Sequence, residues 1–61
     1  MKRHELMRIL LENGWYIERE GGRHTILRHS NRQGSVQVTR STGDIPQGTA
    51  LAILKIAGVK P

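Results

Sequence analysis

The chain begins with a stretch whose apolar positions repeat as they do on one side of an α-helix. The positions i, i+3, i+4 and i+7 are occupied by Leu6, Ile9, Leu10 and Asn13. Met7 and Leu11 widen this stripe. This pattern predicts a helix over residues 3–13. The pair Asn13-Gly14 is a suitable end for it, because glycine adopts the left-handed conformation of a helix cap without steric cost.

The middle of the chain carries three short segments typical of β-strands. Residues 15–20 (WYIERE) begin with aromatic and β-branched residues, residues 24–29 (HTILRH) follow a Gly-Gly pair at 21–22, and residues 35–39 (SVQVT) alternate valine with polar residues. The two glycines predict a tight turn, and residues 30–34 predict a second turn or loop. Strands joined by such short connections form an antiparallel meander.

The last third predicts a loop of turn-forming residues over 40–48 and then a helix over 49–58, which Gly58 ends. The N-cap of this helix is either Asp44 or Thr49, since both residue types accept hydrogen bonds from the first free N–H groups of a helix. The apolar residues are numerous enough to predict that the helix is largely buried; they are Leu51, Ile53, Leu54, Ile56 and Ala57.

These elements predict one small α+β domain covering residues 1–61, in the order α-β-β-β-α. Two helices on one face of a three-stranded antiparallel sheet make a two-layer fold, and the other face of the sheet is left to solvent or to a partner. Adjacent residues of a strand point to opposite faces. One of the neighbouring aromatics Trp15 and Tyr16 should therefore face the core, and the other the open side.

Charge changes this picture, because the chain is strongly basic. Ten Lys and Arg residues against five Asp and Glu give a formal net charge of +5 and a pI near 10.9, which favours a polyanionic partner. Between residues 19 and 40 a single acid, Glu20, accompanies five arginines: Arg19, Arg23, Arg28, Arg32 and Arg40. The planar guanidinium group binds phosphate in a bidentate way. RNA binding is one interpretation of this pattern, and a solvated charged surface is the other.

The composition argues against several kinds of site. Because the chain has no cysteine, we expect neither disulfides nor thiolate metal sites. The same absence predicts a reducing, cytoplasmic location. The acids and the three histidines form no recognisable ligand set, so we expect no metal and no cofactor. No apolar run approaches the roughly 20 residues that cross a membrane, and the first residues carry charge throughout, unlike a signal peptide.

One reaction needs few protein groups. RNA carries its own nucleophile, the 2′-hydroxyl beside the scissile phosphate. One histidine can move a proton in that reaction, while arginines neutralise the charge that grows on the phosphate. His24 is such a histidine, with Arg23 beside it in the turn and Arg28 on the same face by strand parity. His29 falls on the opposite face, so we expect a structural or peripheral role for it.

Other interpretations stay open for these residues. In one, His24 is a surface residue without a role. In another, the chain is a non-catalytic RNA-binding module, since double-stranded RNA-binding domains share the order α-β-β-β-α. Those domains usually carry a lysine cluster at the start of their last helix, whereas this chain has no cation there before Lys55. A third class, a protein-interaction domain, predicts no RNA binding at all.

Three segments of the chain resemble the HicA family, the small mRNA interferase toxins of prokaryotic toxin–antitoxin pairs. ELMRILLENGWYIER is similar to the family's first helix with its Asn/Asp-Gly-Trp end, and GGRHTILRHS to its Gly-Ser-His-His segment and the strand after it. GDIPQGTALAILKIAGV is similar to the family's ending, where a Pro-x-Gly-Thr stretch starts a helix. Together the segments cover nearly the whole chain.

The resemblance implies a fold like that of double-stranded RNA-binding domains and metal-independent cleavage of mRNA. The family's essential histidine corresponds to His24. The resemblance also implies a HicB-type antitoxin that covers the active surface, and Arg19, Arg32 and Arg40 are candidate contacts for that partner or for the RNA backbone.

The chain departs from the family pattern around this histidine. Arg23 stands where a small residue is usual, Thr25 where a second histidine is frequent, and Ser30 where a proline often follows. The catalytic position is filled, but its neighbours differ.

Overall fold

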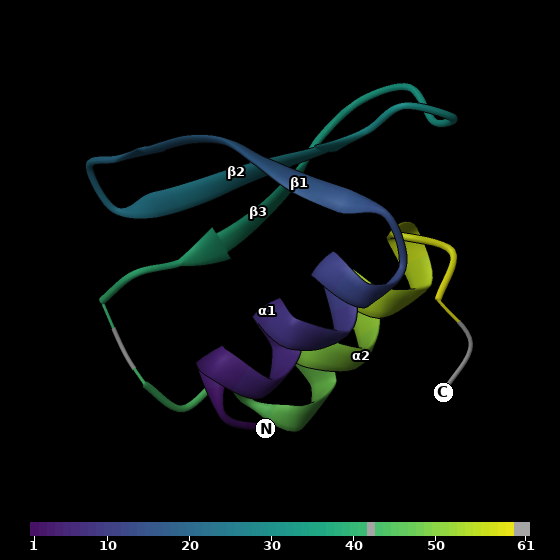
Figure 1. The fold of residues 1–61 in the computed structure, drawn as a ribbon. Helices are drawn as coiled ribbons and strands as arrows, with labels where there is room; N and C mark the ends of the chain where they lie inside the picture. Colours follow the sequence, from purple (N-terminus) through teal and green to yellow (C-terminus); the bar gives the residue numbers. More distant parts are fainter. Residues whose placement is uncertain (42, 60–61) are drawn as a thin grey trace.

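The computed structural model describes residues 1–41 and 43–59. Its elements run in the order α1 (Arg3–Glu12), β1 (Trp15–Gly21), β2 (His24–His29), β3 (Val36–Thr39) and α2 (Gln47–Ile56) (Figure 1). The predicted α-β-β-β-α order is therefore confirmed.

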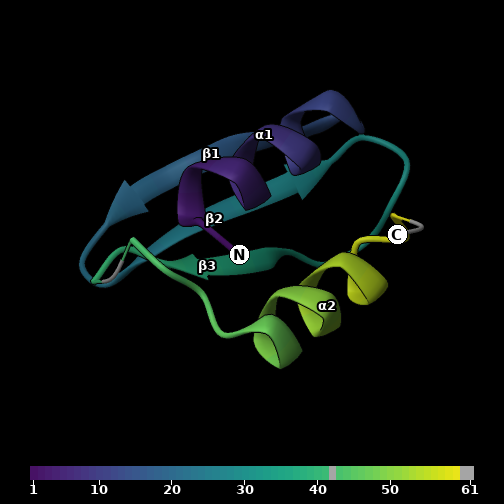
Figure 2. The same ribbon diagram turned by 90° about the horizontal axis from the view of Figure 1, so that it is seen from below.

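The three strands form one antiparallel sheet in the order β1-β2-β3. Both helices lie on the same side of it, α1 against β1 and α2 against β3 (Figure 2). We call the helix-covered side the inner face and the opposite side the outer face. No helix or strand of the described residues covers the outer face (Figure 1), so the predicted two-layer architecture is confirmed as well.

Strand parity decides which residues form the core. In β2, Thr25 and Leu27 are fully buried on the inner face. Trp15 is the inward member of the aromatic pair, and its indole N–H donates to the Ala57 carbonyl at 3.3 Å. Tyr16 points outward and stays half exposed. The aliphatic part of the core comes from both helices, β2, β3 and the loop before α2, through Leu6, Met7, Leu10, Leu27, Val36, Val38, Ile45, Ala50, Leu54 and, at the C-cap of α2, Ala57.

A β-bulge interrupts the pairing of β1 with β2. Ile17 pairs with Leu27, but the next pair is Arg19 with Ile26, so Glu18 is an extra residue in β1. A bulge of this kind leaves one residue unpaired and bends its strand. The carboxylate of Glu18 lies 3.0 Å from Nε of Arg28, and the two side chains form an exposed ion pair.

The turn between β1 and β2 differs from the predicted one. Gly21 belongs to β1 and pairs with His24, so the two turn residues are Gly22 and Arg23 rather than the two glycines. Gly22 has a φ of +60° and Arg23 a negative φ, which is the φ pattern of a type II′ hairpin turn. Such a turn needs only one glycine, and this leaves the second turn position to an arginine.

The start of α2 also differs from the predicted one. The helix begins at Gln47, and its N-cap is Pro46, which makes no side-chain capping bond. Neither Asp44 nor Thr49 is the N-cap. The fixed φ of proline suits it to a helix start, and this allows α2 to begin two residues earlier than predicted.

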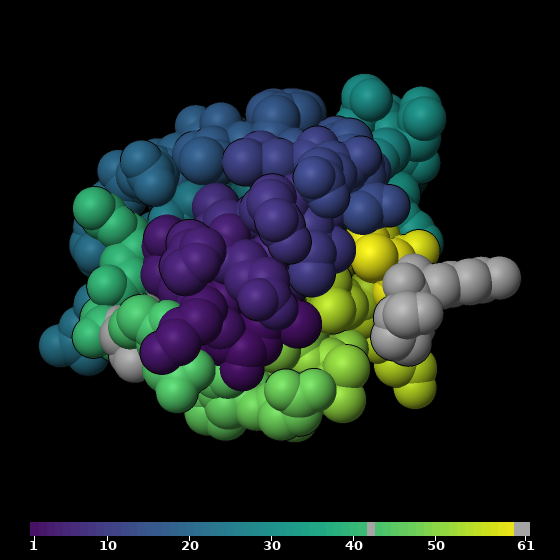
Figure 3. All heavy atoms as spheres, turned by 60° about the horizontal axis from the view of Figure 1, so that its bottom comes forward, coloured from purple at the N-terminus to yellow at the C-terminus, as the bar shows by residue number. Residues whose placement is uncertain are grey.

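The second helix is less buried than its composition predicted. Ala50 and Leu54 are buried and Ala57 follows them at the C-cap, but Leu51 is 44% and Ile56 69% exposed. In a two-layer fold the sheet covers only one side of each helix. Figure 3 shows the opposite side, where α1 and α2 form the surface. The first helix follows the same rule, because Leu11 in its apolar stripe is 47% exposed.

Candidate functional site

His24 occupies the first position of β2 and is exposed on the outer face. Gly21 and Thr39 are its cross-strand partners. Within residues 1–41 and 43–59 the imidazole makes no hydrogen bond and no ion pair. Both ring nitrogens of His24 are therefore available to a ligand on the outer face.

Two arginines lie beside His24 at this end of the sheet. Arg23 precedes it in the turn, and the Arg40 N–H donates to the Arg23 carbonyl at 2.7 Å, which extends the pairing of β2 with β3 by one residue pair. Gly22 and Ser41 join these two arginines around a shallow pocket. The two arginines thus meet at the hairpin, where Arg23 adjoins His24 in the chain. Arg40 has the inward parity of Val36 and Val38 and also lines a pocket with Arg3 and Glu20.

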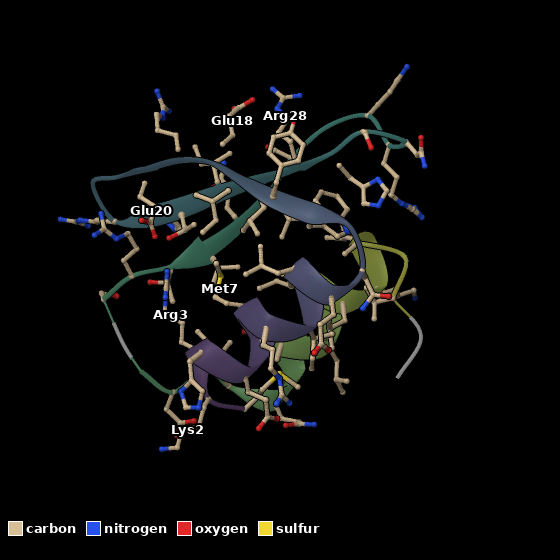
Figure 4. All side chains as sticks on the ribbon, in the orientation of Figure 1. Lys2, Arg3, Met7, Glu18, Glu20 and Arg28 are labelled. Carbon is tan, nitrogen blue, oxygen red and sulfur yellow. The ribbon has the colours of Figure 1, made fainter. Side chains whose placement is uncertain are left out.

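Arg19 and Arg28 are also placed on the outer face. Arg19 pairs with Ile26, two residues along the face from His24. Arg28 lies four residues from His24 along the strand, a distance of about 13 Å in extended chain, and its guanidinium is already paired with Glu18. Figure 4 shows Glu18 and Arg28 together above the sheet, on the side away from the helices. Arg28 is therefore on the predicted face but separated from His24.

Arg32 lies at the other end of the molecule. It is in the loop between β2 and β3, and its guanidinium packs against Gly58, just beyond α2. A cation at the C-terminal end of a helix interacts favourably with the helix dipole. The structure does not bring Arg32 together with His24.

His29 has an environment opposite to that of His24. It lies on the inner face, with its ring edge-on to Trp15 at 5.3 Å between centroids. Its Nδ1 accepts a hydrogen bond from the Asn31 N–H at 3.0 Å, so Nε2 carries the proton and donates it to the Asn13 carbonyl, also at 3.0 Å. These contacts join the end of β2 to the connection between α1 and β1.

A polar network lies on the inner face directly beneath the hairpin. Arg3 of α1 donates from Nη2 to the Thr25 hydroxyl at 2.6 Å and from Nε to the Thr39 carbonyl at 2.8 Å. The Thr25 hydroxyl donates in turn to Glu20 Oε1 at 3.3 Å. A buried hydroxyl left without partners would cost about 1–3 kcal/mol, and here it has two.

Arg3 is not among the predicted site residues, although the sequence carries a signal for it. Arg3 stands three and four positions before Leu6 and Met7, which places it on the apolar side of α1. A cation on that side must reach a polar partner in the sheet. Thr25 has the same strand parity as Leu27, which predicts that its hydroxyl lies on the inner face.

The described residues contain neither a cluster of metal-ligating side chains nor a membrane-spanning helix. In residues 1–41 and 43–59 no three His, Cys, Asp or Glu side chains gather as a metal site would require. No helix in that part of the chain is long and apolar enough to span a membrane.

Comparison with known proteins identifies the family. A family model for the HicA toxin of bacterial toxin–antitoxin systems matches residues 3–59. A search of curated proteins found no match. The family match covers all three segments that resemble HicA toxins in the sequence, together with every helix and strand of the fold. The chain therefore belongs to the HicA family of toxins from bacterial toxin–antitoxin systems.

Proposed function

We propose that this protein is a metal-independent endoribonuclease of the mRNA interferase type and that His24 is its catalytic residue. HicA toxins generally cleave mRNA. The observation that carries the proposal is the accessible His24 imidazole on the outer face, with Arg23 next to it in the hairpin turn. A binding surface alone would not require an imidazole at this point.

The reaction follows from the chemistry of RNA. The 2′-oxygen forms a bond to the adjacent phosphorus while the bond from phosphorus to the 5′-oxygen breaks, which leaves a 2′,3′-cyclic phosphate and a 5′-hydroxyl end. One proton leaves the 2′-hydroxyl and one is added to the 5′-oxygen, so the proton count balances. His24 moves one of these two protons, as general base or general acid, and water supplies or accepts the other.

The arginines have different roles in this proposal. Arg23, in the turn beside His24, stabilises the negative charge on the phosphate under attack. Arg40, whose backbone pairs with that of Arg23, contacts the RNA backbone at the hairpin. Arg19 and Arg28 lie farther along the outer face and contact neighbouring phosphates of the same strand. Arg32, at the other end of the sheet, contacts the RNA backbone or the protein partner.

An antitoxin partner is part of the proposal. Membership of the family implies one. We propose a HicB-type antitoxin that covers the outer face and blocks His24. An acidic surface on that partner would complement the arginines and speed its association with the toxin.

The test compares three purified proteins on one labelled RNA in the presence of a chelator: wild type, His24→Ala, and His4→Ala. His4 is an exposed histidine on α1 and serves as the matched control. We expect the wild type and His4→Ala to cleave equally, and His24→Ala to lose at least about 100-fold, the usual contribution of a general acid or base.

Three outcomes would refute the proposal. Equal cleavage by His24→Ala and wild type would remove His24 from catalysis. A folded wild type that binds RNA without cleaving it would make the protein a non-catalytic RNA-binding module, and RNA affinity would then be unchanged in His24→Ala. The absence of RNA binding even at low salt would leave only a protein-interaction domain.

A further inference from the structure

The imidazole of His24 depends on its backbone for its position. Among the described residues no side chain holds the ring in place. The residue also stands at the end of a strand, next to an exposed two-residue turn. Strand ends of this kind open locally more easily than the centre of a sheet. A reactive group there needs a device that holds the backbone around it.

Arg3 contacts the two residues that define the position of His24. Thr25 follows His24 in the chain, and Thr39 is its partner across the sheet. A single guanidinium donates to both, to the Thr25 hydroxyl at 2.6 Å and to the Thr39 carbonyl at 2.8 Å. It therefore spans β2 and β3 from the inner face, directly under the residue that projects from the outer face.

The backbone of Arg3 lies in the first turn of α1 and is itself held in place. The backbone N–H of Arg3 donates to the Gly43 carbonyl at 2.9 Å. Thr25 is completely buried, and its hydroxyl donates a hydrogen bond to Glu20 in β1. Figure 4 shows Arg3 and Glu20 on the helix side of the sheet, at the end that carries the hairpin. The Arg3 guanidinium thus contacts β2 and β3 directly, and it is linked to β1 through the Thr25 hydroxyl.

The charge on Arg3 has no other evident use in this fold. Within the described residues it makes no direct ion pair with an acid, since Glu20 is reached through the Thr25 hydroxyl. Its side chain is only partly exposed, on the face opposite to His24. The forked shape of a guanidinium allows two donors to be aimed at two different strands, which the single ammonium group of lysine does not match.

We propose that Arg3 is a positioning residue for His24: with Thr25 and Thr39 it forms a clamp that fixes where the imidazole projects over the scissile phosphate. This inference rests on the proposed ribonuclease function and adds a residue that never touches the RNA. Small displacements matter here, because a shift of about 1 Å at a catalytic group costs up to about 100-fold in rate.

The test uses two pairs of variants. Arg3→Met removes both donors and keeps an unbranched side chain, and Arg8→Met is its control, since Arg8 is an exposed arginine of the same helix. Thr25→Val removes the buried hydroxyl at constant shape, and Thr25→Ser restores it. For each protein kcat and KM are measured separately on a labelled RNA, at a temperature where urea denaturation shows the variant to be folded.

We expect kcat to fall about 10- to 100-fold in Arg3→Met and Thr25→Val, with KM within about twofold of the wild type, because the phosphate contacts on the outer face remain. Thr25→Ser should keep most of the wild-type kcat, and Arg8→Met all of it. A purely structural role would lower stability in these variants but leave the kcat of the folded protein unchanged.

Three results would overturn the inference. The first is a wild-type kcat in folded Arg3→Met or Thr25→Val. The second is a loss of kcat in Thr25→Ser as large as that in Thr25→Val. The third is a loss of kcat in Arg8→Met as large as that in Arg3→Met. If Arg3→Met does not fold, the Thr25 pair decides the question alone.

Amide hydrogen exchange separates this inference from the proposed function. The backbone N–H groups of residues 23–25 and 38–40 should exchange about tenfold faster in Arg3→Met than in Arg8→Met if the clamp holds the hairpin. This measurement needs no RNA. An inactive wild type would therefore refute the ribonuclease proposal, whereas unchanged exchange would refute the clamp.

Discussion

At the scale of single residues, His24 and His29 show that two histidines of one short strand can have opposite environments. They stand five residues apart on one strand, so they point to opposite faces. His29 meets Trp15 and two backbone groups on the inner face, which determine its tautomer. His24 meets solvent. The difference in their chemistry comes from strand parity alone.

His29 should therefore matter for stability rather than for catalysis. We expect His29→Ala to lower the free energy of unfolding by about 1–3 kcal/mol, because it removes two hydrogen bonds and an aromatic edge contact. Urea denaturation followed by the fluorescence of Trp15 measures this. His24→Ala should change stability by less than about 0.5 kcal/mol, as is usual for an exposed side chain. A stable His29→Ala protein with reduced kcat would contradict this division of roles.

At the scale of elements, the connections between helices and strands are specified by a few backbone positions. Between α1 and β1 the chain turns at Gly14, which has a φ of +91°. A Cβ atom there would lie 2.7 Å from Nε2 of His29. In the first turn of α2, Gly48 has no such constraint, and a Cβ atom on it would meet nothing within 4 Å.

These two glycines predict opposite effects of the same substitution. Gly14→Ala should destabilise the protein by more than about 1 kcal/mol, since alanine is strained at positive φ and would displace His29. Gly48→Ala should stabilise it by about 0.5 kcal/mol, because alanine loses less conformational entropy in a helix. Thermal and urea denaturation measure both. Equal changes in the two variants would show that neither the φ of Gly14 nor the contact with His29 matters.

At the scale of the whole molecule, the arginines are divided between the two ends of the sheet. Arg23 and Arg40 lie at the hairpin end beside His24, and Arg32 lies at the other end against Gly58. The helical face instead exposes apolar side chains such as Leu51 and Ile56 (Figure 3). The hairpin end therefore carries His24 with two of the arginines, and the opposite end carries Arg32.

The salt dependence of RNA binding should report this division. On a His24→Ala background, which prevents cleavage, Arg23→Ala and Arg40→Ala should each reduce the slope of log K against log salt by about 0.7, as expected when one contact to a single-stranded phosphate is lost. Arg32→Ala should change the slope much less. Fluorescence anisotropy across a salt series measures it. Equal slopes for all three variants would mean that RNA is not centred on the hairpin.

The sequence alone determined the order of the elements and the facing of the residues in β2. Alternation and helical spacing are local properties, so they predicted α1, the three strands and the opposite orientation of His24 and His29. The Gly-Arg-His segment and the resemblance to HicA toxins singled out His24. Burial was less predictable: the exposed Leu51 shows that an apolar residue is buried only where another element covers it.

Only the tertiary structure decided how distant residues meet around His24. Arg3 and Thr39 are 36 positions apart, and Arg3 and Thr25 are 22 apart. The pairing of Arg23 with Arg40 depends on the register of β3, and that of Glu18 with Arg28 on a bulge in β1. Register and helix placement result from the packing of the whole core rather than from any local pattern. The clamp beneath His24 therefore becomes visible only once the chain is folded.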